Sequence, residues 1–546
     1  MLRVALGFAN HAGLAQNNLG FRIVESILTS RGDLALERFF LPPGGLPPGP
    51  GRLRTEPSGI SLAAADLVLF SLSFEGDALH IPALLAGGGL PVAASARRRG
   101  HPLVAAGGAA VMINPEPIAR FFDVFLVGEA EELLARFLDR WQPLRLAPRE
   151  DLLAALDELP GALAPALREH HLWSVGGGRL RAGGVGMLAA EGGRPGEAPS
   201  PLQPKQASEP VETVKWQGLS ETVVAARLPA EAHFHESLLL ELERGCPRRC
   251  RFCVASRIYA PLRLHDPRQL LGFVEHELRP GERIGLLGLS AGDYRHLDLL
   301  TEELSRCGWR LSISSLPADF RRPRAAASLV ASGATTLTIA PESGTDRLRA
   351  LAGKGVRNEA ILETAGLLGA AGIRELKTYF LIGLPFEGPD DLAGIPRLLA
   401  GIRRALPGGC RLSATINPFV PKPRTPFQWA GMAPARQLEQ AVRRLRRDAP
   451  AGVRLRIKSL REARTHAILT RADVSWGARI ERASLEGRSF SRQLRAEGAA
   501  LEDWTAPIEP GSPLPWGYLI SAREEGELER EWQAARREAG IPEAPA

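Results

Sequence analysis

Apolar runs alternate with amphipathic stretches in the first quarter of the chain. Short continuous apolar runs predict buried strands at 3–8, 66–73, 101–111 and the start of 121–141. Residues 20–32 place their apolar side chains at helical spacing. Strands that alternate with helices predict a parallel sheet covered on both faces, so we expect residues 1–145 to form a doubly wound α/β domain.

The alternation is interrupted and then resumes. Residues 146–232 contain the stretch GGRPGEAPSPLQPKQASEP, which lacks periodicity and indicates a linker or crossover region. Strand–helix repeats follow within residues 233–430 and predict a partial (β/α)6 barrel, whose chemistry would lie at the carboxyl ends of the strands. The pattern of residues 431–546 is mainly helical and rich in Arg, and we expect this C-terminal region to cap the barrel or to help bind substrate.

Composition adds little to the prediction of the fold, but it bears on the compartment and on the kinds of partner that we expect. The chain has 546 residues, 45% of them hydrophobic, and a formal charge of +7, so a nucleic-acid partner and a solvated Arg-rich surface both stay open. We find no run of about 18 apolar residues and no signal-peptide pattern, so we expect no membrane span and a cytoplasmic protein. Five cysteines, three of them clustered, fit a reducing compartment better than a disulfide framework.

The clustered cysteines are Cys246, Cys250 and Cys253, in the segment ERGCPRRCRFCVAS just after the first strand of the barrel region. Structural zinc normally takes four Cys or His ligands, and the nearest further candidate, His265, lies twelve residues beyond Cys253. A four-iron, four-sulfur (4Fe-4S) cluster takes one thiolate on each iron, so three thiolates leave one iron open to an external ligand. Three cysteines therefore favour such a cluster over zinc.

The spacing Cys-x3-Cys-x2-Cys, with Phe252 before the last cysteine, resembles the signature of the radical S-adenosylmethionine (SAM) superfamily. This resemblance implies that the amino and carboxylate groups of SAM bind the open iron. It also implies that one electron cleaves SAM to methionine and a 5′-deoxyadenosyl radical, which abstracts hydrogen from a substrate. The electron would come from a reductant such as flavodoxin or ferredoxin.

Segments after the later strands resemble those that contact SAM in this superfamily, in particular LGLSAGD at 287–293, SISSLPADF at 312–320 and IAPESGTDRLRALAGKG at 339–355. Pro317 departs from the pattern, because related proteins often have Arg there. Capping of strand ends is the other explanation for the polar residues of these segments. The cofactor-binding residues that the resemblance implies are Phe252, Ser290, Gly292, Asp293, Ser315, Glu342 and Ser343.

The N-terminal α/β region resembles the cobalamin-binding-type domain that precedes the radical SAM core in one large subgroup, related to the methylthiotransferase-like proteins. The box Asp-x-His-x-x-Gly, whose His ligates cobalt, is absent, because Ala9 and Leu14 stand at its ends around His11. A cobalamin pocket and a retained fold without cofactor both stay open. The pocket residues that the resemblance implies are Ser71, Ser73, Gly107 and Gly108.

These observations favour a radical SAM enzyme that acts on an unknown substrate. The first alternative is a cobalamin-dependent radical SAM methyltransferase. Methylthio transfer is disfavoured, because that reaction needs a second cluster and no cysteine precedes Cys246. A non-catalytic iron–sulfur sensor or an RNA-binding protein is a further alternative, but neither would need the SAM-contact segments on the later strands.

Overall fold

The computed structural model describes residues 1–44, 51–176, 179–188, 204–228, 237–487, 489–496, 501–509 and 511–541. The chain divides into two compact units, each made of two separate segments. The first unit comprises Met1–Trp216 and Thr465–Glu525, and the second comprises Gln217–Arg464 and Gly526–Ala546. Residues 431–546, expected as one C-terminal region, are thus divided between the units. Within residues 146–232, expected as a linker or crossover region, residues 177–178, 189–203 and 229–232 lie outside the described residues.

The first unit is built on a six-stranded sheet in the order β2-β1-β3-β4-β5-β6. All neighbouring strands pair in parallel except β5 and β6, so the expected N-terminal parallel sheet is confirmed. The strands are β1 (Leu2–His11), β2 (Leu34–Leu41), β3 (Leu67–Ser71), β4 (Leu103–Gly107), β5 (Val124–Leu126) and β6 (Ala162–Leu163). The strand order reverses direction between β1 and β3, and the carboxyl ends of strands at such a switch point are where this type of sheet binds ligands.

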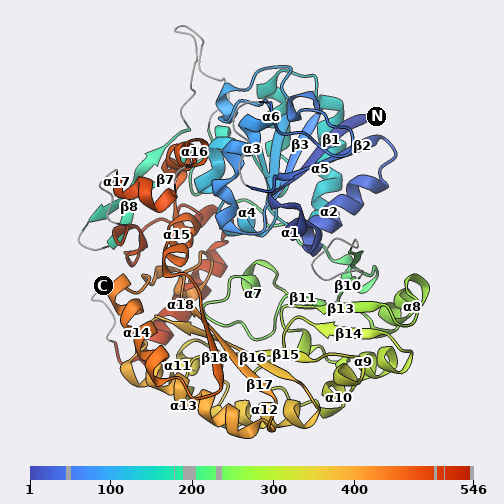
Figure 1. Ribbon diagram of the computed structural model, residues 1–546. Helices are drawn as coiled ribbons and strands as arrows, with labels where there is room; N and C mark the ends of the chain where they lie inside the picture. Colours follow the sequence, from blue (N-terminus) through green and yellow to red (C-terminus); the bar gives the residue numbers. More distant parts are fainter. Residues whose placement is uncertain are drawn as a thin grey trace. The chain divides into compact units, whose positions relative to one another are not determined.

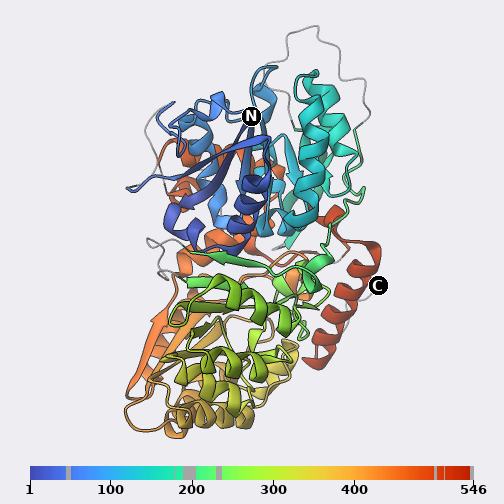
Figure 2. The same cartoon turned by 90° about the vertical axis from the view of Figure 1, so that its right-hand side faces the viewer.

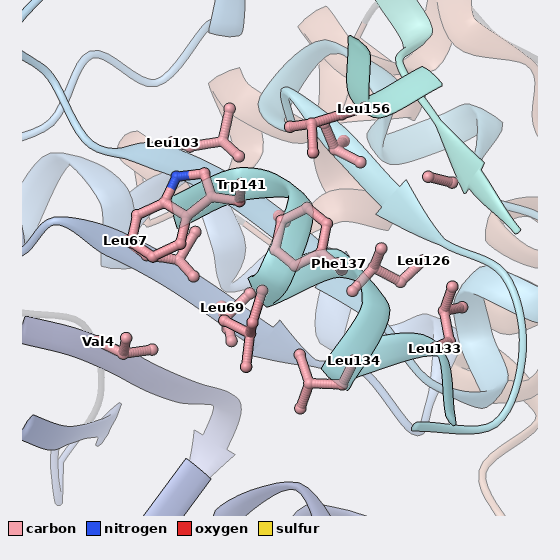
Figure 3. Close-up of a cluster of buried hydrophobic side chains, with 14 of the residues drawn as sticks. Val4, Leu67, Leu69, Leu103, Leu126, Leu133, Leu134, Phe137, Trp141 and Leu156 are labelled. Atoms are coloured by element: carbon pink, nitrogen blue, oxygen red, sulfur yellow. The ribbon is translucent and has the colours of Figure 1, made fainter. Parts of the chain in front are cut away.

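Helix α5 (Ala130–Leu144) illustrates how the core of this unit forms. Its side chains Leu134, Phe137 and Trp141 recur at helical spacing and are buried against strand residues such as Leu69 and Leu126 (Figure 3). Burial of these aliphatic and aromatic groups removes apolar surface from water, which stabilises the contact between helix and sheet. The other N-terminal helices are α1 (Ala12–Gln16), α2 (Leu19–Ser30), α3 (Ile81–Gly87), α4 (Ala109–Ile113) and α6 (Arg149–Asp157).

The chain returns to the first unit near its C-terminus. The Asn114 side-chain amide donates hydrogen bonds to the carbonyl oxygens of Thr470 (3.1 Å) and Ala472 (2.9 Å). The buried Tyr518 hydroxyl donates to Glu116 Oε1 at 2.8 Å. A hairpin that the sequence did not predict also belongs to this unit. The additional elements are β7 (His170–Gly176), β8 (Arg179–Gly186), most of α15 (Leu460–Arg471), α16 (Gly477–Leu485) and α17 (Phe490–Ala496).

The second unit is a curved array of parallel strands, with helices on its outer side (Figure 1). Two four-stranded sheets, β14-β13-β10-β9 and β15-β16-β17-β18, are joined by a parallel bridge between Leu316 and Ile339. Six consecutive parallel strands from β10 to β17 confirm the partial barrel. The strands are β9 (Ala225–Arg227), β10 (Ser237–Glu241), β13 (Arg283–Leu287), β14 (Arg310–Ile313), β15 (Thr336–Glu342), β16 (Glu375–Ile382), β17 (Arg411–Pro418) and β18 (Val453–Ile457).

The barrel helices alternate with these strands along the chain. Strand β18, which lies in the region expected to be mainly helical, extends the barrel sheet by pairing in parallel with β17. A small antiparallel pair, β11 (Glu243–Arg244) and β12 (Arg263–Leu264), follows β10. The helices that alternate with the strands are α7 (Ala255–Ile258), α8 (Pro267–Glu277), α9 (Leu297–Arg306), α10 (Pro323–Ala331), α11 (Asp346–Leu351), α12 (Asn358–Ala370), α13 (Pro389–Ala405) and α14 (Ala435–Asp448). Most of α18 (Ala522–Glu538) also belongs to the second unit. Among the described residues, no helix is long and apolar enough to cross a membrane.

Candidate functional site

The three clustered cysteines lie in one loop between β11 and α7, at the carboxyl end of the first barrel strand. The loop starts at Gly245, whose φ is +94° and whose missing Cβ would lie 2.8 Å from the carbonyl oxygen of Pro261, so only glycine fits there. Cys250 is 8% exposed, and Cys246 and Cys253 are half-buried. The fold therefore brings three thiols together at the end of the barrel where its chemistry was expected.

Two of the thiols are shielded from water, and the charges of Lys354 and Glu342 lie close to Cys250. Burial raises the pKa of Cys250 to about 11, and the charge of Lys354 acts in the opposite direction. Burial also raises the pKa of Cys253. In the described part of the chain, no group of three His, Cys, Asp or Glu side chains converges as ligands of a single metal ion. A 4Fe-4S cluster places its thiolates on separate irons, so three spaced thiols on one loop fit it.

Ser290 and Gly292 lie in the turn after β13, and the structure brings both to the cysteine side of the barrel. The backbone N–H and hydroxyl of Ser290 donate to Glu243 Oε1 at 2.9 and 2.8 Å. Burial raises the pKa of this carboxyl, which is 2% exposed. A Cβ at Gly292 would lie 2.3 Å from Pro317 Cδ, so the proline that replaces the expected arginine packs against this glycine.

Asp293 is held by an arginine of the cysteine loop. Arg248 Nε and Nη2 donate to the two carboxylate oxygens of Asp293 at 2.6 and 2.8 Å, and Nη2 also lies 2.9 Å from Asp319. The pair with Asp293 is bidentate, the strongest geometry for a guanidinium and a carboxylate. Arg248 thus ties the cysteine loop to the ends of two barrel strands, a role that the sequence analysis missed.

Glu342 is the last residue of β15, and its backbone adopts a left-handed conformation, with φ +65°. Its Oε1 lies 3.0 Å from Lys354 Nζ, and both side chains are largely buried. Since Lys354 lowers the pKa of Cys250, this ion pair lies near the thiols. Lys354 stands in a segment that the sequence analysis quoted, but nothing in the one-dimensional pattern distinguished it from a surface lysine.

The other residues that were expected to contact SAM lie in different local environments. Ser343 is buried in the turn after β15, where its hydroxyl accepts a hydrogen bond from the Thr345 backbone at 3.4 Å. Ser315 is half-buried between β14 and the bridge at Leu316. Phe252 packs against a buried apolar cluster that includes Phe427. These positions fit local structural roles as well as cofactor contacts.

The residues expected to line a cobalamin pocket lie at the carboxyl edge of the sheet in the first unit. Gly108 has φ +109°, and a Cβ there would lie 2.5 Å from the Leu72 carbonyl oxygen. Close packing of backbone therefore already requires this glycine. A Cβ at Gly107 would lie 3.3 Å from the Leu126 carbonyl oxygen, and Ser71 is buried at the end of β3.

The same edge holds polar groups that the sequence analysis did not single out. Asn18 Nδ2 donates to Ser73 Oγ at 2.9 Å, and Asn10 Nδ2 donates to Asp77 Oδ1 at 2.9 Å. Asp77 is 2% exposed, and its Oδ2 has no hydrogen-bond partner among the described residues. Burial raises the pKa of Asp77 to about 6. A buried carboxyl oxygen without a partner, at the switch point of the sheet, is typical of a ligand site.

Two family models match the chain, one in each unit. Residues 240–399 match the radical SAM superfamily, and residues 20–165 match the N-terminal region of radical SAM proteins. The chain belongs to the radical SAM superfamily. Members of this superfamily are enzymes that bind a 4Fe-4S cluster and SAM, so the expectations of an enzyme and of these two cofactors are confirmed.

Relatives of this radical SAM protein include the uncharacterized protein MJ0966 of Methanocaldococcus jannaschii, which is 26% identical over 69% of this chain and 73% of its own length. A similar solved structure is the radical SAM methyltransferase TsrM from Kitasatospora setae, with 13% identity and a TM-score of 0.51 over 89% of this chain and all of TsrM. The radical SAM enzyme OxsB aligns with a TM-score of 0.42 and 16% identity over 73% of this chain. The chain spans about half the length of OxsB, 52%.

Proposed function

We propose that Cys246, Cys250 and Cys253 hold the 4Fe-4S cluster and that this site cleaves SAM to act on a substrate. The observation that carries the proposal is the placement of three thiols on one loop at the carboxyl end of the first barrel strand. When bound, the cluster and SAM supply an electron and a 5′-deoxyadenosyl radical, which abstracts hydrogen from the substrate. Cys250 is buried, and the nearby side chains of Glu342 and Lys354 are largely buried, which would limit the access of water to this part of the loop.

The residues around the thiols position the loop and balance charge. Arg248 fixes the loop to Asp293, and Glu243 fixes the turn of Ser290. Lys354 provides a cation near the thiols, whose deprotonated form is the one that binds iron. We propose that Phe252, Ser290, Gly292, Asp293, Ser315, Glu342 and Ser343 surround SAM, either in direct contact or by shaping the turns that contact it.

The test compares two cysteine variants after anaerobic reconstitution with iron and sulfide. Cys250→Ala removes a buried thiol of the loop, and Cys307→Ala removes a half-buried thiol at the end of α9. We expect Cys250→Ala to lose the cluster absorbance and the formation of 5′-deoxyadenosine. Cys307→Ala should keep both. Equal iron content and activity in the two variants would refute the assignment of the ligands.

A second candidate is a cobalamin-dependent radical SAM methyltransferase. It is supported by the match of residues 20–165 to an N-terminal radical SAM region and by the TsrM structure, which contains cobalamin and a 4Fe-4S cluster. Asp77 Oδ2, which has no hydrogen-bond partner among the described residues, would accept a hydrogen bond from an amide group of the corrin side chains. We propose that Ser71, Ser73, Gly107 and Gly108 border this pocket at the carboxyl edge of the sheet.

Cobalamin binding is tested separately from the cluster. The protein is incubated with hydroxocobalamin, passed through a desalting column and measured for corrin absorbance. Comparable absorbance in the Asp77→Leu variant would contradict the role of this carboxyl. Absence of corrin from the wild-type protein would favour an N-terminal fold without cofactor.

The remaining proposals concern the related proteins, the electron donor, the location and the substrate of the enzyme. We propose a place near the methylthiotransferase-like proteins, a flavodoxin or ferredoxin as electron donor, and the cytoplasm as the location. The net charge of +7 keeps a nucleic-acid substrate among the candidates. In α14, Arg443 and Arg444 each pair with an acidic residue of the same helix, which favours a solvated face there.

A further inference from the structure

Helix α18 presents acidic side chains to the segment that carries the cysteines. We define the cysteine segment as residues 245–258, the loop and α7. Three of its arginines pair with glutamates that follow them by more than 270 positions. The pairs are Arg249 with Glu527 (2.9 Å), Arg251 with Glu538 (2.9 Å) and Arg257 with Glu531 (2.9 Å).

The spacing of these glutamates fits one face of a helix. Glu527, Glu531 and Glu538 are separated by four and seven residues, which places them in line along α18. Arg251 uses both Nη atoms for its pair, at 2.9 and 3.1 Å. Arg257 and Glu531 are 8% and 28% exposed, so this pair is screened less than an ordinary surface pair, whereas Glu538, the partner of Arg251, is 47% exposed.

An apolar edge of α18 holds the helix in this position. The Trp532 ring stacks on Phe386 at a centroid distance of 5.6 Å and meets Phe427 edge-on at 6.0 Å. Ala535 is fully buried in the same apolar cluster, against which Phe252 packs. Because Phe252 lies between Cys250 and Cys253, the helix contacts the cysteine segment through both charge and apolar packing. Figure 2 shows α18 as the long red helix near the C-terminus.

We propose that α18 clamps the cysteine segment and keeps its three thiols in the arrangement that receives and retains the cluster. The proposal rests on the proposed function, since it takes these cysteines as the ligands. Arg249 and Arg251 flank Cys250 directly, so each pair restrains the backbone next to a ligand. Arg257 extends this restraint to α7, whose Ser256 hydroxyl donates to the Cys253 carbonyl oxygen at 2.8 Å. Glu527, Glu531 and Glu538 are therefore positioning residues.

The test uses two charge reversals on the same helix. Glu531→Arg breaks the pair with Arg257 and adds repulsion, whereas Glu529→Arg makes the same charge change at an exposed position. In the cluster-free protein, we expect alkylation of Cys253 to be about three- to tenfold faster in Glu531→Arg than in the wild type. The reconstituted variant should lose iron to a chelator faster by a similar factor. Glu529→Arg should match the wild type in both measurements.

A charge swap tests the clamp, and the variant Cys250→Ala tests the assignment of the cluster ligands on which the clamp rests. Arg257→Glu combined with Glu531→Arg restores an oppositely charged pair, and should restore slow alkylation and iron retention. Glu531→Arg behaving like Glu529→Arg would overturn the clamp, even if Cys250→Ala loses its cluster. If Cys250→Ala keeps a full cluster, the proposed ligands fail, and the clamp with them. Circular dichroism of each variant excludes loss of the fold as the cause.

Discussion

Replacing Asp77 by asparagine is expected to stabilise the protein at neutral pH. Burial raises the pKa of Asp77 to about 6, while the hydrogen bond from Asn10 acts against this rise. The folded state therefore binds the Asp77 proton more tightly than the unfolded state, in which the pKa is 3.8. The protonated carboxyl of Asp77 therefore contributes to the free energy of unfolding. This contribution is complete below pH 3.8 and is lost as the pH rises through 6.

The size of this effect follows from the two pKa values. A pKa of about 6 in place of 3.8 corresponds to about 3 kcal/mol of lost stability above pH 7, and about half of that at pH 5. The amide introduced by Asp77→Asn keeps the contact with Asn10 but leaves a buried NH₂ group that lacks an acceptor, which costs about 1–2 kcal/mol. A net gain of about 1–2 kcal/mol at pH 8 remains, which shrinks as the pH falls.

Thermal unfolding of the wild type and Asp77→Asn from pH 5 to pH 8 measures this directly. For a unit of this size, the expected gain raises the melting temperature by about 2–6 °C at pH 8. Parallel pH profiles of the two proteins would refute the reasoning, because they would show that the pKa of Asp77 does not differ between the folded and unfolded states.

Two further substitutions test polar contacts within the second unit and within the first unit. Arg248→Met removes the bidentate pair with Asp293 and should lower the melting temperature by about 2–6 °C, whereas the exposed Arg321→Met should change it little, as differential scanning fluorimetry would show. Tyr518→Phe deprives the buried Glu116 of a hydrogen bond and should cost about 1.5–3 kcal/mol, measured by urea unfolding; a change below about 0.5 kcal/mol would contradict a stabilising role of this contact.

Much of the fold could be predicted because it depends on local patterns. The continuous apolar run within 66–73 marked a parallel strand, β3, that is buried on both faces. The hairpin β7–β8 was missed, because many of its residues are Gly or polar and its pairing partners lie outside any periodic pattern. Strand β18 was missed because its Arg-rich sequence, VRLRI, resembles the neighbouring basic helices.

The candidate site was predictable where spacing along the chain carries the chemistry, as for Cys246, Cys250 and Cys253. It was not predictable where the partners come from distant segments. Arg248 meets Asp293 across 45 positions, and Arg251 meets Glu538 across 287. A single sequence contains no signal for such pairs, since any surface arginine and glutamate look alike in it.

The central claim is that the three cysteines of the loop hold a 4Fe-4S cluster at which SAM is cleaved. The most direct measurement is anaerobic reconstitution of the wild type and Cys250→Ala, followed by iron analysis and an assay of 5′-deoxyadenosine after addition of dithionite and SAM. We predict about four irons for each wild-type chain, together with 5′-deoxyadenosine, and neither in the variant. A variant that retains about four irons and forms 5′-deoxyadenosine at the wild-type rate would contradict the account.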